Sequence, residues 1–203
     1  MKFSAYTVRD WVYVALFGAL WGTLEITLGA YLHVIFPPLA NTFFSGLVMA
    51  GMGVVVALVG SYFVPRTGAV LSIGIITALL KAVSLGGVKV GPMVAILAEA
   101  VLMEVALLLK RVPASWRYVL AGSLAVSWNL PHKFVMMRLL YGKGFTEVYL
   151  QMIREGSQLL GLDMGYAVAI IGAPFVVRLV VGAGAGWLAW ELAGLVARRM
   201  GRE

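Results

Sequence analysis

Residues 164–196, MGYAVAIIGAPFVVRLVVGAGAGWLAWELAGLV, form a long apolar stretch that decides the fold class of the chain. Arg178 and Glu191 are its only charged side chains. An α-helix needs about 20 apolar residues to cross the hydrocarbon layer of a bilayer. The stretch therefore predicts a membrane-spanning helix that is long enough to be tilted or to extend into water.

Five further apolar stretches precede this one and are separated by proline, glycine and basic residues. The segment 142–163 differs from them, because its apolar residues recur at helical spacing with charged residues between them. It predicts an amphipathic helix at the membrane interface or over the bundle. We expect an all-α integral membrane protein, a six-transmembrane-helix bundle forming one domain over residues 1–203. The predicted helices cover about 8–35, 41–64, 68–85, 91–109, 117–141 and 164–196.

The composition leads to the same class. Hydrophobic residues make up 62% of the chain and charged residues only 12%, whereas about a quarter of the residues in a soluble domain are charged. So few charges cannot cover so much apolar surface in water, which leaves that task to lipid. The net charge of +7 is typical of basic residues that flank membrane helices, so we expect no nucleic-acid partner.

The distribution of Lys and Arg predicts the orientation. With the N-terminus inside, nine basic residues fall in cytoplasmic segments and four in outer segments. We therefore expect a multi-pass protein of the plasma membrane with both termini in the cytoplasm. Because Glu25 lies within the first apolar stretch and no small-residue cleavage site ends it, we expect a retained helix rather than a signal peptide.

Ionisable side chains at membrane depth are costly, so each is a candidate functional group. Most of those in the predicted helices share the outer half of the membrane, whereas Glu104 and Arg178 fall closer to its middle. This pattern predicts a polar pocket that is open to the outside and suits a small ligand. The alternative is simple pairing within the bundle, of Glu99 or Glu104 with Lys133 or Arg178.

Pro131 lies within the predicted helix 117–141 and removes one of its backbone hydrogen bonds, so we expect a kink there. Trp21 and Tyr31 offer aromatic surfaces for a planar ligand. The predicted ligand contacts are Glu25, Tyr31, Lys81, Glu99, Asn129, His132 and Lys133.

Small residues form two neighbouring stripes on the first helix, Ala15 with Ala19 and Gly18 with Gly22. Spacing of this kind permits close approach of a second helix. Either stripe can serve packing inside the bundle or docking of a partner.

The sequence holds no recognisable catalytic motif. It contains no Walker motif, no HExxH and no GxSxG, and it has no cysteine and only two histidines. We expect a protein that is not an enzyme and that carries neither a metal nor a cofactor.

Taken together, the predicted six helices, the cytoplasmic termini and the Ala15–Ala19 step resemble the S component of energy-coupling factor (ECF) transporters. The resemblance implies that the chain binds a vitamin or vitamin precursor at its outer side. It also implies that Ala15 and Ala19 dock on the transmembrane coupling subunit of the transporter, while partner ATPases hydrolyse ATP.

Residues 64–109 resemble more narrowly the S components associated with hydroxymethylpyrimidine, a thiamine precursor. Arg66, Gly68-Ala69 and Gly91-Pro92-Met93 match the turns that open helices three and four in that group. Helix three of the group carries carboxylates where this chain has Gly74 and Lys81. That departure implies a different, less cationic ligand.

Two other functions are compatible with the sequence. A stand-alone ion-coupled transporter or channel would use Glu99, Glu104 and Arg178 as a relay. A non-transporting membrane assembly protein would pair its charges internally and bind no ligand.

Overall fold

The computed structural model describes residues 5–35, 45–83, 90–142 and 144–201. Over these residues the chain is all-helical and contains no strand, which confirms the predicted all-α class. The helices are α1 (Val8–Ile35), α2 (Ser45–Phe63), α3 (Ala69–Ala82), α4 (Val90–Leu107), α5 (Ala114–Tyr141), α6 (Phe145–Leu160), the short 3-10 helix η1 (Met164–Tyr166) and α7 (Ala167–Arg199).

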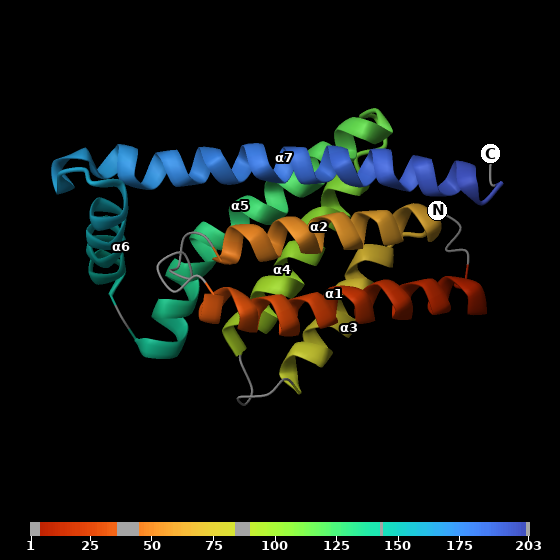
Figure 1. The fold of residues 1–203 in the computed structure, drawn as a ribbon, viewed down its shortest axis with the longest axis horizontal. Coiled ribbons are helices and arrows are strands. Elements are labelled where there is room, and N and C mark those ends of the chain that lie inside the picture. The colour runs from red at the N-terminus through yellow and green to blue at the C-terminus, as the bar shows by residue number, and fades with distance from the viewer. Residues whose placement is uncertain (1–4, 36–44, 84–89, 143, 202–203) are drawn as a thin grey trace.

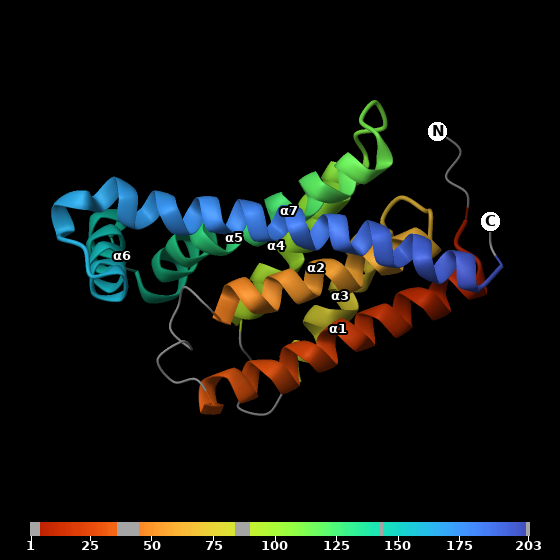
Figure 2. The ribbon, with the colours of Figure 1, turned by 45° about the horizontal axis from the view of Figure 1, so that its top comes forward.

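The long helices form an elongated bundle (Figure 1). α7 runs along its whole length, α1 and α2 lie lengthwise beside it, and α4 and α5 cross obliquely behind. The start of α1 and the end of α7 lie at the same end of the bundle in both ribbon views (Figure 2). We call this the terminal end, and the opposite end, where α6 is set across α7, the α6 end.

Within the described ranges, four segments are long and apolar enough to cross a membrane. They are Val8–Leu28, Gly46–Phe63, Val90–Leu107 and Met164–Arg199. α3 has only 14 residues, about 21 Å at the rise of an α-helix. α5 has 28 residues but is interrupted by polar side chains such as Asn129 and Lys133. The predicted count of six spans therefore remains a prediction for α3 and α5.

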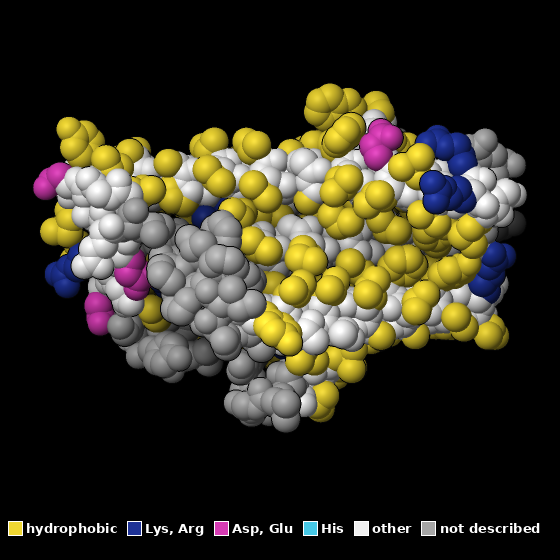
Figure 3. All heavy atoms as spheres, viewed as in Figure 1, with side chains coloured by type: hydrophobic (Ala, Val, Ile, Leu, Met, Phe, Trp, Pro, Cys, Tyr) yellow, Lys and Arg dark blue, Asp and Glu magenta, His cyan; other side chains and the backbone are white. Residues whose placement is uncertain are grey.

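The surface has the polarity of a membrane protein. Apolar side chains cover the middle of the face in Figure 3, while charged side chains gather toward its two ends. Large exposed hydrophobics occur on α1, α4 and α7, among them Leu16, Val105 and Val180. A soluble monomer rarely exposes so large an apolar area, so this belt suits contact with lipid.

α5 and α7 make the most extensive contact of any pair of described helices. A methyl group added to Gly186 would overlap the carbonyl oxygen of Tyr118. One added to Gly122 would overlap the Gly182 carbonyl and lie 2.9 Å from the Gly186 nitrogen. Only glycine lets these two backbones touch, as in other close crossings of membrane helices.

The two stripes of small residues on α1 have different environments. Methyl groups added to Gly18 and Gly22 would meet Ile76 at 2.8 Å and Leu80 at 2.7 Å, so this stripe packs on α3. Ala15 and Ala19 are exposed. The glycine stripe thus serves packing within the chain, and the alanine stripe lies on the outer surface.

The segment that follows α5 forms the amphipathic helix α6 at one end of the bundle. Its buried side chains Val148 and Met152 pack with Leu130 of α5, and Gly156 lies against Ile170 of α7. α6 therefore covers the joint between α5 and α7.

The glycine crossing gives a first prediction. Gly186→Ala should lower the free energy of unfolding by about 1–3 kcal/mol, because the α5 and α7 backbones must separate. The loss should appear as a lower melting temperature of the purified chain in detergent.

Gly184→Ala is the matched control, because nothing lies within 4 Å of the added methyl group. Its stability should be unchanged or slightly higher, since alanine favours the helix. Equal melting temperatures for the two variants would contradict the crossing.

Candidate functional site

Polar side chains from four helices form a cluster within the bundle, away from the terminal end. We call Glu25 of α1, Lys81 of α3, Glu99 of α4 and Asn129 of α5 the polar cluster. The Lys81 Nζ atom lies 3.2 Å from Glu25 Oε2 and donates a 2.7 Å hydrogen bond to the Glu25 carbonyl oxygen. Both side chains of this pair are only 11% exposed. The pair thus joins the last turn of α3 to α1.

Glu99 is the most deeply buried acid of the polar cluster, with 3% of its surface exposed. Asn129 Nδ2 donates a 2.8 Å hydrogen bond to Glu99 Oε1. In the described part of the chain, no Lys or Arg forms an ion pair with Glu99. The carboxylate of Glu25 also repels that of Glu99. A buried carboxylate that relies on a single neutral amide is costly, so Glu99 is poised to accept a further donor.

Three buried ring nitrogens on the helices that carry Glu25 and Asn129 have no partner among the described residues. Trp21 Nε1, Trp128 Nε1 and His132 Nδ1 have no hydrogen-bond partner within the described residues. Trp21 precedes Glu25 by one helical turn, and Trp128 is adjacent to Asn129. Most buried polar atoms in proteins are hydrogen-bonded, so these three nitrogens remain available to a water or a polar ligand.

The other predicted ligand contacts lie outside this arrangement or at its edge. Lys133 forms a 2.7 Å ion pair with Glu155 and so ties α5 to α6. The His132 ring lies 6.2 Å from that of Trp128. Tyr31 is 62% exposed, and Trp21 is buried against Gly53 of α2. The structure thus brings together Glu25, Lys81, Glu99 and Asn129, and it leaves Tyr31 at the surface.

Glu104 has a different role from the one that its depth suggested. It lies at the terminal end, where its carboxylate accepts backbone N–H groups from Gly68, Val70 and Leu71 at 2.6, 3.1 and 3.4 Å. These are the unpaired donors of the first turn of α3, which carry partial positive charge. Glu104 is therefore a cap that α4 supplies to the first turn of α3.

The ion pairs that sequence reasoning offered as an alternative do not form. Neither Glu99 nor Glu104 pairs with Lys133 or Arg178 among the described residues. Arg178 is 2% exposed and donates from Nη1 to the Pro174 carbonyl oxygen at 3.1 Å, within α7. The described residues also contain no group of three or more His, Asp or Glu that could hold a metal ion.

Sequence reasoning also missed a second site. A pocket of about 350 Å³ opens at the terminal end, lined by basic and aromatic side chains. Its residues come from four separate parts of the chain, so no local motif could have indicated it.

No family model, curated protein or solved structure matches this chain. The function of the polar cluster must therefore be argued from its own geometry.

The Glu104 cap gives a second prediction. Glu104→Ala should lower the free energy of unfolding by about 1–2 kcal/mol, because three backbone donors lose a charged acceptor. Thermal unfolding in detergent measures the change.

Glu191→Ala removes an exposed acid of α7 and is the control. If Glu104→Ala melted at the same temperature as Glu191→Ala, the cap would contribute nothing to stability.

Proposed function

We propose that the chain is a membrane-embedded substrate-capture subunit of an ECF-type importer for a small water-soluble vitamin or precursor. In this proposal α3 and α5 span the membrane with the four apolar helices, the terminal end faces the cytoplasm and α6 lies outside. The observation that carries the proposal is Glu99, a buried carboxylate whose described partner is one neutral amide.

The polar cluster favours a ligand that donates hydrogen bonds. Glu99 supplies acceptor oxygens, and Asn129 supplies an amide beside them. The Glu25–Lys81 pair places an acceptor and a donor on the other side of the cluster. An amino-substituted heteroaromatic ring carries donors and acceptors of this kind, as the resemblance to the thiamine-precursor group would suggest. Binding sites are mostly apolar with a few convergent polar groups. The four polar side chains of the cluster, one from each of four helices, are therefore enough to orient such a ring.

The exposed stripe on α1 supports assembly with a coupling subunit. Ala15 and Ala19 continue at the same spacing into Thr23 and Thr27, and all four are exposed. Small side chains in a row let a partner helix approach closely. The chain itself would do no chemistry, and partner ATPases would supply the energy.

The ion-coupled carrier is the second candidate, and one observation weighs against it. Its relay needs Glu104 to exchange protons, whereas three backbone N–H groups hold that carboxylate at the terminal end. The third candidate, an assembly protein, predicts no ligand at all.

Ligand binding is the direct test of the capture proposal. The purified chain in detergent is titrated with thiamine, hydroxymethylpyrimidine, biotin, riboflavin and pantothenate, and intrinsic tryptophan fluorescence is followed with correction for absorbing ligands. We expect saturable binding of one of them. Glu99→Gln should weaken that binding about tenfold or more, because it removes a charged acceptor.

Glu191→Gln removes the same charge from an exposed position and should leave the affinity unchanged. The capture proposal would be contradicted if the folded chain bound none of the five ligands. It would also be contradicted if the Glu99→Gln variant bound its ligand as tightly as the unchanged chain. Uptake by the chain alone, driven by an ion gradient, would favour the carrier.

Docking gives a separate prediction. The double variant Ala15→Leu with Ala19→Leu should fold and bind ligand as before, since both side chains are exposed. It should no longer co-purify with an ECF coupling subunit and its ATPases expressed in the same cells, because leucine holds the helices apart.

Ala173→Leu places the same bulk on an exposed position of α7 and should co-purify normally. Unchanged co-purification of the double variant would show that this stripe does not dock.

A further inference from the structure

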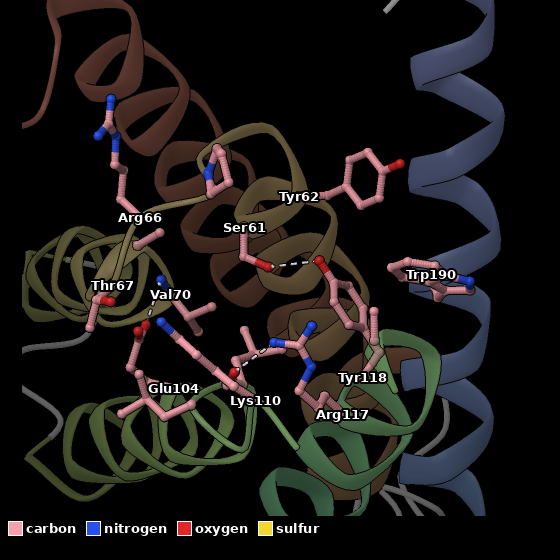
Figure 4. A pocket seen from close by; sticks show the side chains of 15 residues that line it. Ser61, Tyr62, Arg66, Thr67, Val70, Glu104, Lys110, Arg117, Tyr118 and Trp190 are labelled. Carbon is pink, nitrogen blue, oxygen red and sulfur yellow. Dashed lines mark hydrogen bonds between the residues drawn. The ribbon is translucent and has the colours of Figure 1, made fainter. Parts of the chain in front are cut away.

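The pocket at the terminal end has two chemically different sides. Figure 4 shows its lining, which includes Arg66, Lys110, Arg117, Tyr62, Tyr118 and Trp190. The basic side chains come from the turns before α3 and after α4 and from the start of α5. The aromatic side chains come from α2, α5 and α7. The pocket lies at the terminal end of the bundle and shares no residue with the polar cluster, although α4 and α5 contribute to both.

Two cations of the pocket have donors to spare. Lys110 is exposed, and no hydrogen bond or ion pair engages it within the described residues. Arg117 donates from Nη1 to the Leu107 carbonyl oxygen at 3.0 Å, while its Nε is buried without a partner in the described chain. Arg66 also lines the pocket, but its Nε lies 3.4 Å from Asp10, whose carboxylate offsets its charge.

The acid that lines the pocket does not cancel these charges. The carboxylate oxygens of Glu104 accept hydrogen bonds from the backbone N–H groups of Gly68, Val70 and Leu71. The positive end of α3 therefore offsets its charge. With Arg66 offset by Asp10 and Glu104 offset by the start of α3, the charges of Lys110 and Arg117 leave the pocket attractive to an anion.

The opposite side is an aromatic wall. The Trp190 ring packs edge-on against Tyr118, with ring centroids 5.2 Å apart, and against Tyr62 at 5.8 Å. A 3.2 Å hydrogen bond between Ser61 Oγ and the Tyr118 hydroxyl fixes this wall on α2. An occupant that fits both sides carries an anionic group and an apolar or planar part.

We propose that this pocket binds a phosphate ester, with its phosphate at Lys110 and Arg117 and its apolar part against Tyr118 and Trp190. Guanidinium and ammonium groups are the usual partners of phosphate in proteins. The headgroup of an anionic phospholipid and a soluble phosphate ester share this chemistry. The proposal stands apart from the capture function, because it uses none of the polar cluster.

The test uses the purified full chain in a neutral detergent. The probes are inorganic phosphate, phenyl phosphate and short-chain phosphatidylglycerol, with zwitterionic short-chain phosphatidylcholine as the comparison. Binding is followed by the rise in melting temperature and by tryptophan fluorescence. Trp190→Phe should reduce the fluorescence change, which assigns the signal to the pocket.

The decisive variants are Lys110→Gln and Arg111→Gln. Both remove one positive charge from the same turn, but only Lys110 lines the pocket. Lys110→Gln should weaken binding of the phosphate probes about tenfold, the typical loss of a charge-assisted hydrogen bond. Arg111→Gln should leave it unchanged. Adding Arg117→Gln to Lys110→Gln should remove saturable binding, and melting without probe checks that each variant is folded.

The probes separate the two sources of phosphate. Binding of phosphatidylglycerol alone assigns a lipid headgroup, and binding of phenyl phosphate without phosphatidylglycerol assigns a soluble ester. The absence of saturable binding by any of the three anionic probes would overturn the proposal. Equal losses in Lys110→Gln and Arg111→Gln would also overturn it, because they would show attraction to the charged surface rather than to the pocket.

Discussion

The backbones of α5 and α7 touch where Gly122 meets Gly182 and Gly186, and the arrangement of both sites depends on this contact. Asn129 lies about two turns beyond Gly122 on α5, and Arg117 lies just over one turn before it. One crossing therefore fixes the helix that supplies side chains to the polar cluster and to the pocket at the terminal end. Since α7 runs the length of the bundle, it sets the position of α5 for both.

Two acids on α4 show how neighbouring positions acquire different roles. Glu99 and Glu104 are five residues apart, and both are acids in an apolar helix. Glu104 meets the open donors of a helix end and becomes part of the scaffold. Glu99 meets a single amide and is left short of donors. The difference comes from what α3 and α5 present to each acid, not from the acids themselves.

This contrast explains which features were predictable. The apolar stretches located the helices, because lipid imposes their length and composition on the local sequence. The sequence also allowed the polar cluster to be predicted, because the depth of each residue along its helix can be counted from the helix end. The direction in which a side chain points depends on neighbouring helices, so Tyr31 at the surface and the Glu104 cap were not predictable. The terminal pocket was hidden for the same reason, since Arg66, Lys110 and Trp190 meet only after folding.

In the proposed topology α7 crosses the membrane, and its length then links the protein to the thickness of the bilayer. Its 33 residues extend about 50 Å, against a hydrocarbon layer of about 30 Å. Tilting absorbs part of this hydrophobic mismatch, and the rest projects beyond the lipid. α6 is attached at one end of this helix, so a thinner bilayer leaves it further out in water and a thicker one draws it toward the headgroups. In the proposed topology, the hydration of α6 would therefore depend on the host membrane as well as on the chain.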